Sequence, residues 1–461
     1  MACRGATPGY IEMTAAVQTC ALVIGYHRPP ISWSRTHGWR KPLSPNGILP
    51  TLSRLFTVEK LPAVWVTGAI TDGADRAPFD GHRSGIPLSF VPLSQHLWTA
   101  YVQQVCKDAL WPVLMSQPQR MRFDPTAWAY YRTVNERFAE RIDATASRGA
   151  TVWLHDYNLW LVAGTLRAAR PDLKLGLFHH TPFPPSAMLS ALPVADEIRA
   201  ALACLDWVGF HTRTFAERFR HALAGVARLP RIGVHPLGID RIAVASLARS
   251  RAPFVRQLPG PLVLSVERLD YVKAPLEKVA AIETLLARRP DLHGHLRFRL
   301  VCPPPEPGIT VYDATKSALE QRISEVNRTY GTAGWQPIEY LPQSLSFTQV
   351  IDEYLAADVL WVTSLQDGMN LTAKEFVAAQ IAAGRSGVLV LSANAGAAEE
   401  LGSAALLTDP HSHEDLVDKL AQSLALPYDQ RTARLQHLSD LLGHDPPAYW
   451  AARIIADIHD H

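Results

Sequence analysis

The sequence lacks any apolar run long enough to cross a membrane, since none approaches the roughly 18 residues that a membrane helix needs. Cysteine is scarce: the five cysteines are scattered and include no CxxC pair, which argues against a disulfide framework or a zinc site. The net charge is only +2 over 461 residues, which argues against an extended nucleic-acid or membrane surface, although local anion sites remain open. We therefore expect a cytoplasmic protein with no metal, no nucleic-acid partner and no membrane contact.

What the sequence does have is a regular alternation of strand-like and helix-like segments. Short apolar runs recur at 21–26, 64–67, 151–154, 173–178, 207–210, 262–266, 297–301, 359–362 and 388–391. Helical patterns lie between most of them, for example at 128–146, 195–203, 276–286 and 312–330. This alternation predicts an α/β protein whose parallel sheets are covered by helices on both faces. The strands are too many for one sheet, so we expect two Rossmann-like domains that face each other across a cleft.

The composition also suggests where these domains begin and end. Proline and arginine accumulate over 244–261, which favours a linker there, and Trp450 and Ile454 share one face of the last helical pattern. The expected divisions are a disordered leader over 1–20, a first domain over 21–243, the linker, a second domain over 262–443, and a helix over 444–461 that crosses back to the first domain.

The charged turn after the apolar run 262–266 is the first candidate site. Arg268 and Lys273 lie five residues apart on this turn, before a helical pattern begins. Ligands of open parallel sheets bind outside the carboxyl ends of the strands. A planar guanidinium and a compact ammonium placed there are suited to hold a diphosphate. A solvated loop whose charges bind nothing is the alternative.

A second candidate follows the run 359–362. Asp367 and Gly368 form a turn, and apolar residues then recur at helical spacing, so the N–H groups of residues 369–371 (Met369, Asn370 and Leu371) would lie at a helix N-terminus. Such an end carries a partial positive charge and binds phosphate. Glu375, one turn further on, would accept hydrogen bonds from ribose hydroxyls. The alternative is a capped helix with Glu375 in a surface ion pair.

Five stretches of the first half carry further candidates. Arg28 follows the first run, and Asn46 and Gly47 lie in a turn that lets the backbone approach an anion closely. Asp156 ends another run, where it would either bind sugar or glycerol hydroxyls or cap a helix.

His180, in the pair His179-His180, would donate a hydrogen bond to a sugar hydroxyl or be a satisfied buried histidine. Neighbouring side chains of a strand point to opposite faces, which disfavours a metal site at this pair. Trp111 fits either a cleft wall or the core.

Taken together, these stretches resemble a known family of enzymes. The motifs HDYNLW at 155–160, FHHTPFP at 178–184, ERLDYVK at 267–273, DGMNLTAKEFVAAQ at 367–380 and LSANAGAAEEL at 391–401 are similar to those of the trehalose-6-phosphate synthases, retaining glycosyltransferases of family 20. Within that family, SPNGILPTL at 44–52, HDYNLW and RLDYVK look more like the glucosylglycerol-phosphate synthases. The resemblance runs from about residue 21 to the C-terminus.

The resemblance implies a GT-B fold and a role for each candidate. Arg268 and Lys273 would hold the diphosphate of the donor, with backbone contacts from residues 369–371 and with Glu375 on the ribose. His180 would touch the donor glucose, Asp367 its hydroxyls, and Asp156 would lie at the reaction centre. Asn46 and Gly47 would lie over the phosphates.

The resemblance also implies the substrates. They would be a nucleotide-diphosphate glucose, with ADP-glucose favoured, and glycerol 3-phosphate; no cofactor is expected, and a homo-oligomer is left open.

Two positions depart from the family pattern. Trehalose-6-phosphate synthases hold the sugar phosphate with an Arg at about the position where this chain has Glu306, and a carboxylate would repel that phosphate. Ala274 stands where the family has Gly after the lysine, which is costly if the position needs a positive φ. Three alternatives remain: a trehalose-6-phosphate synthase that uses glucose 6-phosphate, a transferase that couples pseudo-sugars, and a non-catalytic nucleotide-sugar-binding relative.

Overall fold

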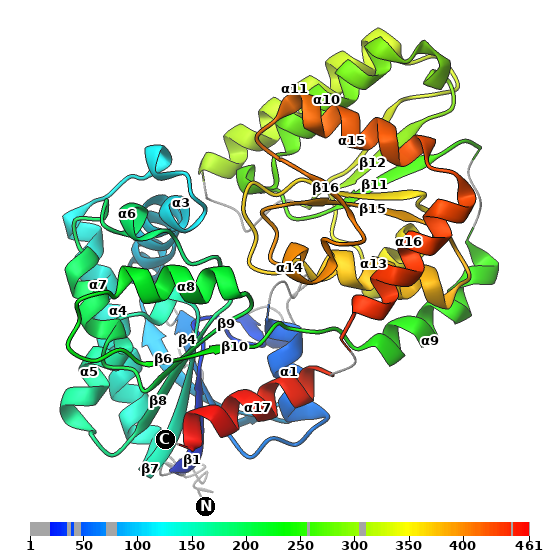
Figure 1. The fold of residues 1–461 in the computed structure, drawn as a ribbon. Helices are drawn as coiled ribbons and strands as arrows, with labels where there is room; N and C mark the ends of the chain where they lie inside the picture. Colours follow the sequence, from blue (N-terminus) through cyan, green and yellow to red (C-terminus); the bar gives the residue numbers. More distant parts are fainter. Residues whose placement is uncertain are drawn as a thin grey trace, which may run out of the picture.

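The computed structural model describes residues 19–34, 38–40, 48–70, 81–255, 259–303, 310–443 and 446–460. It confirms the expected α/β class, with two lobes that each contain a largely parallel sheet between layers of helices (Figure 1). Asn46, Gly47 and Glu306 lie outside the described residues, as does the expected leader up to residue 18.

The first domain is built on an eight-stranded sheet of order β10-β9-β8-β7-β1-β4-β6-β5. Its pairs are parallel, except that β5 runs antiparallel to β6. The strands are β1 Cys20–Gly25, β4 Val64–Ile70, β5 Gly81–Arg83, β6 Ile86–Leu93, β7 Ala146–His155, β8 Lys174–His179, β9 Trp207–Phe210 and β10 Arg231–Val234. A separate antiparallel pair consists of β2 Ser32–Ser34 and β3 Gly38–Arg40.

Helices cover both faces of this sheet, and the core lies between them and the strands. They are α1 Leu49–Thr57, α2 Gln95–Thr99, the π-helix η1 Ala100–Leu110, α3 Trp111–Leu114, η2 Pro118–Arg120, α4 Pro125–Thr145, η3 Tyr157–Leu159, α5 Val162–Ala169, α6 Ser186–Leu189, α7 Ala195–Leu202 and α8 Arg213–Ala222.

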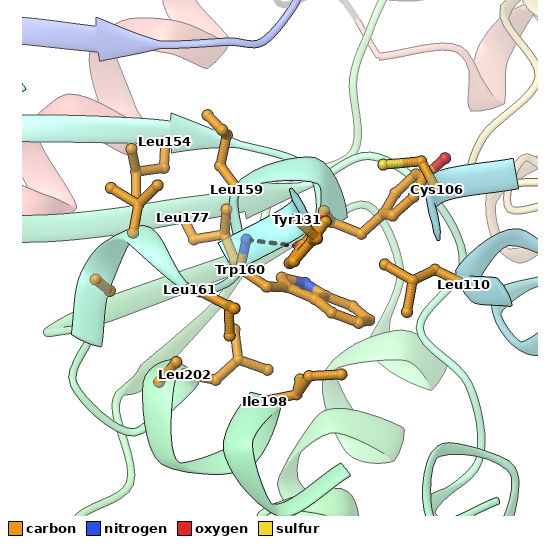
Figure 2. Close-up of a cluster of buried hydrophobic side chains, with 14 of the residues drawn as sticks. Cys106, Leu110, Tyr131, Leu154, Leu159, Trp160, Leu161, Leu177, Ile198 and Leu202 are labelled. Atoms are coloured by element: carbon orange, nitrogen blue, oxygen red, sulfur yellow. Dashed lines mark hydrogen bonds between the residues drawn. The ribbon is translucent and has the colours of Figure 1, made fainter. Parts of the chain in front are cut away.

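Figure 2 shows part of this core, in which Trp160 packs among leucine side chains from the sheet and the helices. The Tyr131 hydroxyl accepts from the Trp160 N–H at 3.3 Å (Figure 2). It also donates to the Tyr157 carbonyl oxygen at 2.5 Å. These bonds fix the loop that follows β7.

The second domain is built on a six-stranded parallel sheet of order β13-β12-β11-β14-β15-β16. Three of its strands, β11, β14 and β15, are nearly continuous apolar runs, as expected for parallel strands covered on both faces. Its strands are β11 Leu262–Val266, β12 Arg297–Val301, β13 Ile338–Leu341, β14 Val359–Val362, β15 Val388–Ser392 and β16 Leu406–Thr408. Its helices are α9 Arg241–Arg251, η4 Ala252–Phe254, η5 Tyr271–Lys273, α10 Pro275–Arg288, η6 Pro290–Leu292, α11 Thr310–Tyr330, α12 Phe347–Ala356, α13 Leu371–Ala382, α14 Ala398–Leu401, α15 His413–Ala425 and α16 Tyr428–Leu441.

The linker expected over 244–261 is mostly helical and belongs to the second domain. Val244 and Ala248, four residues apart on α9, are buried in the same core cluster as α12 and α13. The chain instead crosses between the domains over 235–240, where the Lys374 ammonium donates to the Leu237 carbonyl oxygen at 2.9 Å. The prolines and arginines of 244–261 had suggested a linker. The helical spacing of Val244 and Ala248 instead packs this segment into the core of the second domain.

The last helix, α17 Pro447–His459, packs on β7, β8 and β9 and on α1 of the first domain (Figure 1). Trp450, Ile454 and Ile458 are fully buried in this contact. No described helix has the length and the apolar character that a membrane span requires.

Candidate active site

A cavity of about 210 Å³ lies where the two domains face each other. The second domain contributes Arg268, Lys273, Asp367 and Gly368 from the loops after β11 and β14. The first domain contributes residues from four separate segments, namely Arg28, Lys107, Trp111, Asp156 and His180. Most of the candidates from the sequence therefore line one cavity. Residues 369–371 and Glu375 lie beyond its lining on α13 and the turn before it.

Lys273 is held firmly in the second-domain wall. Its Nζ lies 2.6 Å from Oδ2 of Asp367, which also accepts from Asn370 Nδ2 at 3.1 Å. Burial opposes ionisation of Asp367, but the Lys273 ammonium outweighs it and holds the pKa of this carboxyl below its usual value. Arg268 forms no ion pair within the described part of the chain. One of the two cations is thus already paired and the other is available.

Helix α13 begins next to this ion pair. Asn370 caps it in the left-handed conformation, with φ 86°, and its side chain accepts from the Ala373 N–H at 3.0 Å. No described group accepts from the N–H groups of residues 369–371, so this helix end can bind an anion.

Glu375 lies further along α13 and forms no ion pair with any described residue. The alternative in which it forms a surface ion pair is therefore wrong. Oε2 of Glu375 accepts from the Tyr354 hydroxyl at 3.0 Å, and burial raises the pKa of this carboxyl to about 7. The residue does not line the cavity, so this structure does not bring it together with the other candidates.

Two small residues fix the backbone of this wall. Ala274, directly after Lys273, is fully buried and has φ 55° and ψ 46°, the left-handed conformation in which a methyl group is costly. Gly368 touches the first domain: a Cβ atom there would lie 1.9 Å from the carbonyl oxygen of His180. No side chain fits at position 368 unless the two domains move apart.

Asp156 in the first-domain wall serves as a cap and also lines the cavity. Its Oδ1 accepts from the N–H of Tyr157, which begins η3, and from the Thr181 N–H and hydroxyl, at 2.9–3.2 Å. Its φ of 67° is rare for a residue other than glycine, and such conformations cluster at functional sites. The capping interpretation is therefore confirmed, and the binding of sugar or glycerol hydroxyls by Asp156 stays a prediction.

His180 is the middle member of a row of three imidazoles. His155 Nδ1 lies 3.0 Å from its Nε2, and His211 Nε2 lies 3.3 Å from its Nδ1. Burial lowers the pKa of His155 and of His211 to about 3, and that of His180 well below its usual value. All three rings are therefore neutral near pH 7. Because both nitrogens of His180 are engaged, a hydrogen bond to a sugar hydroxyl would require one of these contacts to break.

Several lining residues escaped the sequence reasoning, namely His27, Lys107 and Gln366, and so did the buried His211 behind the wall. His27 and His211 each follow the carboxyl end of a strand, which is the signal that identified Asp156 and His180. Lys107 lies inside a helix, where no such signal exists. Its Nζ is 4.0 Å from the centre of the Trp111 ring, and Trp111 belongs both to the core and to the cavity wall.

Comparison with known proteins identifies the family of this chain. The family model described as glycosyltransferase family 20 matches residues 33–460. The chain belongs to glycosyltransferase family 20, a family of hexosyltransferases.

Several of the curated relatives are glucosylglycerol-phosphate synthases. The chain is 36% identical to the glucosylglycerol-phosphate synthase of Pseudomonas anguilliseptica, covering 95% of this chain but only 65% of that relative. It is 30% identical to the glucosylglycerol-phosphate synthase of Picosynechococcus sp., with 94% and 95% covered.

The fold is shared with solved family members. An α,α-trehalose-phosphate synthase (UDP-forming) from Burkholderia vietnamiensis superimposes with a TM-score of 0.84 at 28% identity, over 96% of this chain and 97% of the other. The expected two-domain GT-B architecture is thereby confirmed.

Proposed function

We propose that this family-20 chain transfers glucose, with retention, from a nucleotide-diphosphate glucose to glycerol 3-phosphate. The observation that carries the proposal is the convergence of Arg268 and Lys273 with Arg28, Lys107 and Asp156 on one cavity between the domains. Four cations face two carboxylates there, Asp156 and Asp367, so the cavity is suited to a reaction in which two phosphate-bearing substrates meet.

In this proposal the second-domain wall receives the leaving diphosphate. As the bond between the sugar C1 and the phosphate oxygen breaks, the electron pair and the growing negative charge remain on the diphosphate. Arg268, Lys273 and the N–H groups at the start of α13 would stabilise that charge without rearranging, as preorganised donors do in an oxyanion hole. The acceptor hydroxyl would attack from the same face and release its proton to the leaving phosphate oxygen.

The choice of glycerol 3-phosphate is supported by the departure at Glu306 and by the names of the two curated relatives. Trehalose-6-phosphate synthesis is the second candidate, because the superimposed Burkholderia structure is a trehalose-phosphate synthase. The sequence disfavours it, because Glu306 stands at about the position where the resemblance expects the Arg that holds the phosphate of the larger acceptor.

The test is an assay that combines ADP-glucose or UDP-glucose with glycerol 3-phosphate or glucose 6-phosphate. We expect glucosylglycerol phosphate as the main product, formed faster from ADP-glucose. Efficient trehalose 6-phosphate formation would favour the second candidate, and the absence of transfer from either donor would contradict the proposal.

A further inference from the structure

Lys107 differs from the other lysines that point into the protein. Lys273 pairs with Asp367, Lys278 with Glu267, and Lys374 with Glu400. Among the described residues, no carboxylate forms an ion pair with Lys107, and no hydrogen bond is made by its ammonium. A half-buried cation without a counter-ion costs desolvation energy that an anionic ligand can offset.

The local geometry holds this cation at the cavity wall. Lys107 lies on η1, a wide helical segment of the kind often found at functional sites, four residues before Trp111. Residues four apart are neighbours on a helix, and the ammonium sits 4.0 Å from the centre of the Trp111 ring. Trp111 therefore supports the side chain while the charge faces the cavity.

The charges around Lys107 also favour an anion. The charged and titratable groups that act on it are Arg28 and His27 from the end of β1, Arg268 and Asp270 from the loop after β11, and Cys106 beside it on η1. Burial, followed by the charge of Arg268, lowers the pKa of Lys107 to about 8. Burial raises the pKa of Cys106 to about 12 and lowers that of His27, so neither neighbour titrates near pH 8.

We propose that Lys107 binds the phosphate group of the acceptor and so makes the enzyme select a phosphorylated acceptor. This inference rests on the proposed function, in which the second-domain wall receives the diphosphate. Lys107 lies in the opposite wall, which also carries Asp156. An acceptor phosphate held there would place the rest of a small molecule toward the donor sugar.

Two variants test this role. Lys107→Met keeps the chain length over Trp111 but removes the charge, and Lys107→Arg keeps the charge. For Lys107→Met we expect the KM for glycerol 3-phosphate to rise at least about thirtyfold, as when one partner of a buried charge pair is lost. The KM for the nucleotide-glucose should stay within about threefold, and Lys107→Arg should recover most of the acceptor affinity.

The pH dependence is an independent readout that needs no variant. In the wild type, the KM for glycerol 3-phosphate should rise as the pH increases above about 8, because the free lysine loses its proton, and Lys107→Arg should abolish this rise. An unchanged acceptor KM in Lys107→Met, or a rise in the donor KM alone, would overturn the inference. The latter result would assign Lys107 to the diphosphate.

The outcome separates this inference from the proposed function. Wild-type transfer to glycerol 3-phosphate supports the proposed function whatever the variants do. If the wild type instead uses glucose 6-phosphate, the proposed acceptor is wrong, but the same comparison run with that acceptor still tests Lys107. Wild-type activity on unphosphorylated glycerol as good as on glycerol 3-phosphate would overturn the inference directly.

Discussion

The two walls of the cavity differ in how their charges are held. The second-domain wall comes from two short segments, and its lysine is already paired with Asp367 beside a capped helix. The first-domain wall is assembled from segments far apart in the sequence, and it combines His27 and His180, whose pKa values burial lowers, with Lys107, which pairs with no described carboxylate. The second-domain wall thus already pairs one of its two cations, Lys273, and leaves Arg268 available, whereas Lys107 in the first-domain wall is held among the described residues only by its contact with the Trp111 ring.

The largest expected effect comes from removing Lys273, the paired cation of the second-domain wall. Lys273→Ala should lower kcat at least about a hundredfold, as the loss of one oxyanion-hole donor does, and should also lower the melting temperature, because Asp367 loses its counter-ion. Lys316→Ala is the matched control, because the side chain of that lysine is 42% exposed and does not line the cavity. Near-normal turnover of Lys273→Ala would show that the two walls do not differ in the way described.

The contact between the walls can be broken at Gly368. In Gly368→Ala, the new methyl group would collide with the His180 backbone, so the domains must shift. We expect a loss of about 1–3 kcal/mol of stability, typical of overpacking, together with at least about a tenfold loss of activity, since a shift of this kind misplaces reacting groups. The control Gly334→Ala places its methyl group in open space. Equal melting temperatures and rates for the two variants would contradict the contact.

The histidine row should make the first domain sensitive to acid. Because the pKa values of His155 and His211 are about 3 when folded but near 6.5 when unfolded, the unfolded chain binds more protons between these values. The free energy of unfolding should therefore fall as the pH falls from about 6.5 toward 3, by up to about 1.4 kcal/mol per pH unit for each histidine.

Denaturant unfolding at several pH values measures this dependence. His155→Asn should flatten it by about one histidine's share, whereas His413→Asn, on the exposed surface of the second domain, should leave it unchanged. If both variants gave the wild-type slope, protonation of the row would not limit stability in acid.

The smallest effect is expected at Ala274. A glycine there would relieve about 1–2 kcal/mol of left-handed strain. It would also lose a buried methyl group, worth about 0.8 kcal/mol, and gain unfolded-state entropy worth about 0.4–1 kcal/mol. These contributions nearly cancel, so Ala274→Gly should change the free energy of unfolding by less than about 0.5 kcal/mol. A stabilisation above about 1.5 kcal/mol would show that backbone strain at Ala274 outweighs the other two contributions.

The difference between the two walls also explains which parts of the fold and of the site could be predicted from the sequence. Nine strands were predicted from apolar runs and all are present. The strands that were not predicted are β2, β3, β5, β6, β10, β13 and β16; β6 contains Pro87 and Pro92, which are unusual in a strand, and β16 is only three residues long. The second-domain candidates Arg268, Lys273 and Asp367 follow strand ends within contiguous motifs. Lys107 and the pairing of His155 with His180 depend on contacts between distant segments, which no local pattern reveals.

The most direct test of the account is a crystal structure with a nucleoside diphosphate and glycerol 3-phosphate bound together. We predict that the diphosphate lies within hydrogen-bonding distance of Arg268, Lys273 and the N–H groups of residues 369–371, and that the acceptor phosphate contacts Lys107 from the opposite wall. A diphosphate bound away from Arg268 and Lys273, or both phosphate groups bound on the same wall, would contradict it.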